Sequence, residues 1–125
     1  MNIDIRFDNN GRTVALYGGR EITMDESPYM VFLATAGLCS AVYVRAFMTQ
    51  RGMSLEGVSL TQKMNYNRMT NMVEDIEIVV NLPKTFPTKY SKAIIAVVNQ
   101  CPVKQHFITP PKMEVVTNID MEIEA

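Results

Sequence analysis

The chain has 125 residues, of which 47% are hydrophobic and 20% are charged, a composition typical of a folded globular protein. This length predicts a single domain over 1–125, because domains centre on roughly 100 to 150 residues. Twelve basic and thirteen acidic residues leave a net charge of -1, so no global field attracts nucleic acid or an anionic membrane. The composition therefore favours a small molecule or another protein as partner.

The N-terminal sequence MNIDIRFDNNGR has polar and acidic residues where a signal peptide has a basic start and an apolar stretch. The longest apolar run, from Pro28 to Val44, is shorter than the roughly 20 residues that a bilayer requires. We therefore expect a cytoplasmic protein in which this run forms a buried core helix. Thiols stay reduced in that compartment, so Cys39 and Cys101 are interpreted as catalytic, redox-active or inert thiols rather than a structural disulfide.

The first part of the chain predicts a meander of three short strands. Apolar residues alternate with polar ones up to Phe7, which indicates a strand with one buried face. A polar turn then leads to a second strand over 13–17, and a Gly-Gly turn leads to a third short strand around Ile22.

A long helix is predicted from Pro28 to about Arg51. Ser27 suits the N-cap position, and Gly52 suits the left-handed conformation that ends a helix. The first four turns are apolar on every side, so we expect a central, enclosed helix. Because one small sheet cannot cover such a helix, this pattern predicts a homodimer.

The second half of the chain predicts a hairpin, two short helices and a last strand. Apolar and polar residues alternate in both hairpin strands, and helical spacing of apolar residues follows. The order βββ-α-ββ-αα-β segregates strands from helices, which predicts an α+β fold with an antiparallel sheet. The predicted elements of this half cover 58–62, 72–82, 90–99, 102–108 and 113–124.

Cys39 lies three turns into the long helix, among small side chains that leave space beside the sulfur. That space permits either close helix packing or a substrate next to a reactive thiol. The alternative is that Cys39 is a small buried hydrophobic residue. A pocket beside its sulfur would be lined by Phe32, Thr35, Tyr43 and Tyr29.

Cys101 precedes Pro102 and is expected at the N-cap of a short helix, where free backbone N–H groups stabilise a thiolate. The alternative is that it fills the junction between two helices. His106, the only histidine, would point about 140° away from the Cys101 sulfur on a continuous helix, so we interpret it as a partly exposed helix residue.

Cofactor motifs are absent from the sequence. No CxxC or HxxxH spacing supports a metal, and no GxGxxG or Walker A motif supports a nucleotide. With one histidine and no GxSxG sequence, serine hydrolase chemistry has little support. We therefore expect neither a cofactor nor a metal.

The segments SPYMVFLATAGLCSAVYV, at 27–44, and NQCPVKQHF, at 99–107, together resemble the OsmC/Ohr family of thiol-dependent hydroperoxide reductases. A proline eleven residues before a cysteine in a small-residue helix, followed by Cys-Pro-Val at a helix junction, is typical of that family. The resemblance implies an OsmC-like α+β fold, an intertwined homodimer and active sites at the subunit interface. It also implies that Cys39 is the peroxidatic cysteine and that Cys101 resolves it as a disulfide.

The resemblance further implies an organic hydroperoxide as substrate and a dithiol, such as a lipoyl group, as reductant. Members of the family typically supply an arginine from the N-terminal hairpin, held by a glutamate directly after the helix-starting proline. Tyr29 occupies that glutamate position here, with Asp25 and Glu26 nearby as substitutes. Arg12 matches the arginine by topology, whereas Arg20 matches it by the local Gly-Gly-Arg string.

A second hypothesis assigns the same fold to a protein that is not an enzyme. An OsmC-like dimer would then bind an apolar ligand, or sense oxidants through the pair Cys39 and Cys101, without turnover.

Overall fold

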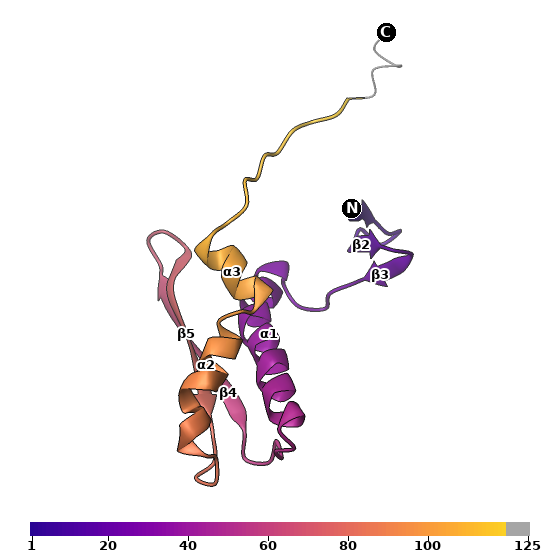
Figure 1. The fold of residues 1–125 in the computed structure, drawn as a ribbon. Coiled ribbons are helices and arrows are strands. Elements are labelled where there is room, and N and C mark those ends of the chain that lie inside the picture. The colour runs from indigo at the N-terminus through magenta and orange to yellow at the C-terminus, as the bar shows by residue number, and fades with distance from the viewer. Residues whose placement is uncertain (120–125) are drawn as a thin grey trace.

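The computed structural model describes residues 1–119 and combines two antiparallel sheets with a long helix and two short ones (Figure 1). Strands and helices are segregated along the chain, which confirms the predicted α+β fold. The elements are, in chain order, β1 (Asp4–Phe7), β2 (Thr13–Tyr17), β3 (Arg20–Ile22), α1 (Pro28–Gln50), β4 (Ser59–Asn67), β5 (Met72–Asn81), the 3₁₀ turn η1 (Thr88–Tyr90), α2 (Ser91–Val98) and α3 (Pro102–Ile108).

The first sheet is a three-stranded meander in the order β1-β2-β3. Its first turn is held by Asp8, whose carboxylate accepts the backbone N–H groups of Asn10 at 2.8 Å and Arg12 at 2.9 Å. An extended segment joins β3 to α1, and the sheet stands apart from the helices and from the β4-β5 hairpin (Figure 1). Apolar side chains such as Ile5, which is 64% exposed, consequently remain open to solvent.

The ends of α1 follow the predicted signals. Ser27 is the N-cap, and its hydroxyl oxygen accepts the backbone N–H of Met30 at 3.1 Å. Pro28 occupies the first helical position, where its missing N–H costs nothing. At the other end, Arg51 caps the helix and Gly52 has a φ of +66°, a conformation that favours glycine.

The core lies where α1 meets α2 and the hairpin. Val44 and Phe47 face Ile94 and Val98 of α2, and all four side chains are buried. The guanidinium of Arg51 lies 3.7 Å from the centroid of the Phe47 ring and closes the core at the helix end. Partly buried residues around this cluster come from every element of the second half except α3, and include Val58, Leu60, Val80, Leu82, Tyr90 and Ala93.

The expectation that α1 is enclosed is met on two sides only. α2 and α3 cover one side and β4 covers another, whereas a third side stays exposed in the single chain. Met30, Leu38 and Val42 on this side are 52%, 64% and 47% exposed. A row of large apolar side chains on a helix is typical of a surface that another protein element covers.

By length and composition α1 also qualifies as a membrane-crossing helix, with a mean hydropathy of 1.6 over its most apolar window. The sequence argument against a membrane span counted only the apolar run up to Val44, whereas the helix that contains this run continues to Gln50. Core helices pass the same test of composition. The interpretation of α1 as a core helix is supported instead by its six buried side chains and by the elements packed on it.

The predicted last strand is wrong for the residues that the structure describes. Residues 109–119 form no strand, and the chain after α3 runs away from the body of the molecule (Figure 1). A strand needs a partner for its backbone hydrogen bonds, and none of the strands within residues 1–119 pairs with this segment. Val115 and Val116 are accordingly 91% and 73% exposed, while 120–124 of the predicted strand lie outside the described residues.

The core predicts where truncation is costly. Phe47→Ala should lower the free energy of unfolding by about 3–5 kcal/mol, because it removes a buried ring and leaves a cavity. Met69→Ala, at a side chain that is 94% exposed, should change it by less than about 0.5 kcal/mol. Urea unfolding of both variants at one protein concentration measures the difference, and equal effects would contradict this description of the core.

Candidate active site around two thiols

The structure brings Cys39 and Cys101 together from segments more than sixty residues apart. Cys39 lies on α1 and is half-buried, whereas Cys101 is completely buried just before α3, and both are free thiols. α3 is held on α1 by the rings of Phe32 and Phe107, whose centroids are 5.0 Å apart. A side-chain hydrogen bond links the two cysteines. The two thiols therefore lie next to each other at the contact of α1 and α3.

The surroundings of Cys39 raise the pKa of its thiol above the ordinary value. Burial is the largest cause, and the hydrogen bond and charge interaction with Cys101 add to it. A backbone hydrogen bond from Val103 acts in the opposite direction and favours the thiolate. In the single chain the balance favours the neutral thiol, which is a weaker nucleophile than the thiolate.

Cys101 occupies the predicted N-cap of α3, but its thiol does not cap the helix. Its backbone N–H donates to Val98 and its carbonyl accepts from Gln105, both at 3.0 Å, while the side chain makes no capping hydrogen bond. The thiol interacts with Cys39 instead. We expected free N–H groups at the helix start to stabilise a Cys101 thiolate. The side chain does not make that contact.

Arg12 lies in the turn between β1 and β2, and Arg20 begins β3, so both candidate arginines belong to the sheet that stands apart from α1 (Figure 1). Nη2 of Arg12 lies 3.5 Å from Oδ1 of Asp25, and both side chains are exposed. An arginine–carboxylate pair thus exists near the start of α1 although Tyr29 replaces the expected glutamate. Arg20 is exposed at the start of β3, and Glu26 is exposed in the segment before α1.

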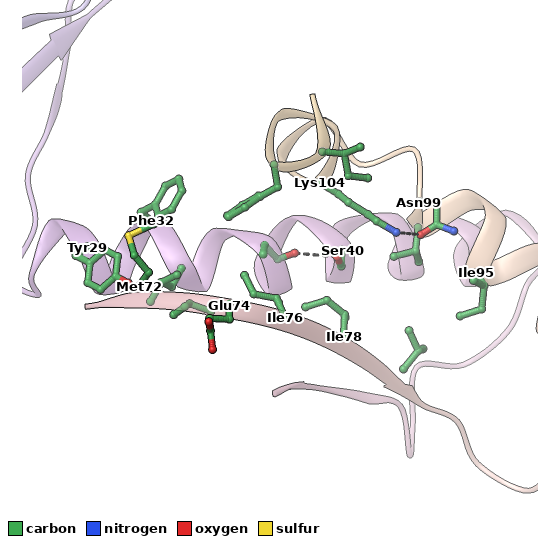
Figure 2. A pocket seen from close by; sticks show the side chains of 17 residues that line it. Tyr29, Phe32, Ser40, Met72, Glu74, Ile76, Ile78, Ile95, Asn99 and Lys104 are labelled. Carbon is green, nitrogen blue, oxygen red and sulfur yellow. Dashed lines mark hydrogen bonds between the residues drawn. The ribbon is translucent and has the colours of Figure 1, made fainter. Parts of the chain in front are cut away.

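A cavity of about 550 Å³ lies between α1, β5, α2 and α3 (Figure 2). Its walls are mostly apolar, including Phe32, Ile76, Ile78 and Ile95, and the amine of Lys104 donates to Asn99 at one side. The carboxylate of Glu74 points away from α1 in Figure 2, toward its partner Asn67 on β4.

The structure divides the four predicted pocket residues into two groups. Tyr29 and Phe32 line this cavity, whereas Thr35 and Tyr43 do not, and Tyr43 packs against the core instead. Neither cysteine is among the lining residues. The cavity therefore lies on a neighbouring side of α1 and does not open directly on the thiol pair.

His106 is exposed on α3, as expected, and its Nδ1 lies 2.6 Å from the carbonyl oxygen of Pro102 in the preceding turn. Within 1–119, no group of three or more histidine, cysteine or acidic side chains is arranged to hold a metal ion.

Sequence reasoning missed Gln62, a half-buried residue of β4 whose side chain reaches α1. Its amide oxygen accepts the backbone N–H of Gly37 at 2.9 Å, and its amide nitrogen donates to the carbonyl of Leu33 at 2.8 Å. The sequence carried one signal for this role. Gln62 is a polar residue two positions after Leu60, so it lies on the same, inward-facing side of the strand. Alternation alone does not reveal that its partner is a helix backbone.

The family model for OsmC-like proteins matches residues 24–116, which is most of the chain. The protein therefore belongs to the OsmC-like family. The fold is similar to the crystal structure of a protein from Psychrobacter arcticus 273-4, described as an osmotic stress induced and detoxification response protein, with a TM-score of 0.61 and 14% identity. The likeness covers 84% of this chain and 86% of the other, and no curated protein matches in sequence.

The thiol pair predicts a pH-dependent difference between variants. Cys101→Ala removes two causes that raise the pKa of Cys39 but leaves burial, so that pKa should fall toward its ordinary value. Because only the thiolate is alkylated, the rate of iodoacetamide labelling at Cys39 should reach its midpoint at lower pH than in the wild type. Mass spectrometry of the Cys39 peptide across pH measures this midpoint.

Val103→Ala is the matched control, because it keeps the backbone group that bonds to Cys39 and should leave the midpoint unchanged. A midpoint that stays in place or moves to higher pH in Cys101→Ala would contradict the described interaction between the thiols.

Proposed function

We propose that this protein is a two-cysteine thiol peroxidase that reduces organic hydroperoxides, with Cys39 as the peroxidatic residue and Cys101 as the resolving residue. The observation that carries the proposal is the hydrogen-bonded thiol pair at the contact of α1 and α3. Membership in the OsmC-like family and the stress-response description of the structural neighbour support it.

The proposed chemistry has three steps. The Cys39 thiolate attacks the distal peroxide oxygen, which breaks the O–O bond, releases an alcohol after protonation and leaves a sulfenic acid. The Cys101 thiol then attacks the Cys39 sulfur, forms the disulfide and expels water. A dithiol, such as a lipoyl group, reduces the disulfide by exchange and is itself oxidised. No cofactor takes part in these steps.

The proposal includes a homodimer, because the single chain leaves too much apolar surface uncovered. Exposed apolar residues gather on three parts of the described chain: Ile3, Ile5 and Phe7 on β1 and its start, Met30, Leu38 and Val42 on α1, and Met113, Val115, Val116 and Ile119 after α3. A second copy would cover these parts by exchanging the N-terminal sheet and the C-terminal segment.

A dimer also supplies what the Cys39 thiol lacks. Desolvation raises the pKa of Cys39, and a nearby cation is the physical means of lowering it again. Arg12 and Arg20 lie on the sheet that stands apart from α1, so an arginine from a second copy is the proposed source of that charge. The catalytic centre would then form at the subunit interface.

The cavity favours a second candidate function. Its apolar walls and its volume of about 550 Å³ suit a medium-sized apolar ligand, since ligand pockets range from about 300 to 1,000 Å³. An OsmC-like dimer could bind such a ligand, or sense an oxidant through the cysteine pair, without repeated turnover. Multiple turnover distinguishes the two candidates.

The peroxidase proposal predicts that one equivalent of cumene hydroperoxide consumes both thiols of the wild-type protein. Cys39→Ser should keep the Cys101 thiol reduced, because no sulfenic acid forms to react with it. Cys101→Ser should instead accumulate a Cys39 sulfenic acid that dimedone traps. Thiol titration and mass spectrometry measure all three outcomes.

Repeated consumption of hydroperoxide with dihydrolipoamide present would support the enzyme. A single stoichiometric oxidation without recycling by the dithiol would favour the sensor. Two thiols that stay reduced through long exposure would contradict both functions.

The dimer predicts that a charge on the exposed side of α1 prevents association. Leu38→Glu should shift the protein from a dimer to the 14.1 kDa chain, because it places a carboxylate in the apolar interface. Met69→Glu is the control. It places the same charge on an exposed apolar side chain in the turn between β4 and β5, and it should leave the dimer intact. Sedimentation velocity measures the mass, and a wild-type protein that sediments as a monomer would contradict the dimer.

A further inference from the structure

The side-chain amide of Gln62 forms hydrogen bonds with two backbone groups of α1. In a regular α-helix the N–H of residue 37 donates to the carbonyl of residue 33. Here the Gly37 N–H donates to Oε1 of Gln62, and Nε2 of Gln62 donates to the Leu33 carbonyl. One amide from β4 therefore bridges the N–H of Gly37 and the carbonyl of Leu33, the two groups of one helical rung.

Gly37 makes this approach possible. A Cβ atom at position 37 would lie 2.7 Å from Oε1 of Gln62, closer than such atoms approach in proteins. Glycine is otherwise unfavourable inside a helix, because it has more conformational freedom to lose. The pairing of Gly37 with Gln62 gives a physical reason for a glycine in the middle of α1.

The bridged rung lies directly beside the thiol pair along the helix. Cys39 is two residues after Gly37, and two residues rotate the helix by about 200°, so the Cys39 side chain leaves α1 on the side opposite to Gln62. Cys101 meets it there. This turn of α1 is consequently held by β4 on one side, through directional hydrogen bonds, and contacts α3 on the other.

We propose that Gln62 is a positioning residue that sets the rotation and depth of this turn of α1, and so the distance between Cys39 and Cys101. The inference rests on the proposed function in one respect, since disulfide formation is the step that it assists. The positioning role of Gln62 differs from general packing. An amide has a fixed donor and a fixed acceptor and so specifies the position of the helix backbone, whereas apolar packing permits sliding and rotation.

The test uses a variant that removes both hydrogen bonds from Gln62 to α1. Gln62→Met keeps the length and volume of the side chain but lacks the amide, so this turn of α1 would lose its directional contacts with β4 and change its position. Gly37→Ala should act in the same direction, because the added methyl displaces the Gln62 amide. Lys63→Met is the matched control, since it changes an exposed neighbour on the opposite face of β4.

The measurement is the equilibrium between the dithiol and the Cys39–Cys101 disulfide of the full chain in glutathione redox buffers, followed by thiol trapping. We expect the disulfide to be about tenfold less stable in Gln62→Met and Gly37→Ala, a rise of about 30 mV in reduction potential, and unchanged in Lys63→Met. Thermal unfolding separates positioning from stability: alanine favours helices, so Gly37→Ala should weaken the disulfide without lowering the Tm.

Unchanged potentials in both variants, or an equal shift in Lys63→Met, would overturn the inference. If Gln62→Met does not fold, the comparison of Gly37→Ala with Lys63→Met decides the matter alone. The glutathione equilibrium requires no peroxide, so it tests Gln62 even if the peroxidase proposal fails. Conversely, a wild-type protein that forms no sulfenic acid would contradict the proposed function and leave this equilibrium as an independent result.

Discussion

The rest of the structure depends on how α1 is covered. A helix of 23 residues that is apolar on nearly every side is stable in water only where other elements remove that surface from solvent. The hairpin, α2 and α3 do this on two sides, and their meeting points create the other features of the molecule. The core forms where α2 packs on the second half of α1, and the thiol pair forms where α3 packs on the first half.

The same covering creates a conflict for the chemistry. A thiol on this helix is desolvated, which raises its pKa, while nucleophilic attack on a peroxide needs the thiolate. The backbone group of Val103 offsets part of the desolvation, but the two candidate arginines, Arg12 and Arg20, belong to the N-terminal sheet, which stands apart from α1. Under the proposed function, the burial that brings Cys39 to Cys101 would therefore also make the reactivity of Cys39 depend on a positive charge from a second copy.

Much of the fold was predictable because its signals are local. The cap at Ser27, the stop at Gly52 and the helix start at Pro102 depend on a few neighbouring residues, and the structure has all three. The prediction of the last strand was wrong because strand pairing depends on two segments. The apolar pattern around Val115 does not identify the sheet edge with which this segment would pair.

The candidate site could be predicted from the sequence only in part. Cys39 and Cys101 were identified from helix placement and resemblance, and the structure brings them together. Gln62 was missed because its partners are backbone groups of another element, which leave no pattern in side-chain chemistry. Tyr29 and Phe32 line the cavity while Thr35 and Tyr43 do not, because helical neighbours of one cysteine spread over more than one side of α1.

If the proposed dimer forms, its assembly and its reactivity are coupled by one geometric fact. The thiol pair lies within one subunit, while the candidate cations belong to a sheet that, within residues 1–119, stands apart from α1 and the β4-β5 hairpin. Disulfide formation would then need only one folded chain, whereas thiolate formation would need two. A free subunit would hold its two cysteines close together with the pKa of Cys39 raised, so burying the apolar side of α1 and activating Cys39 would be a single event.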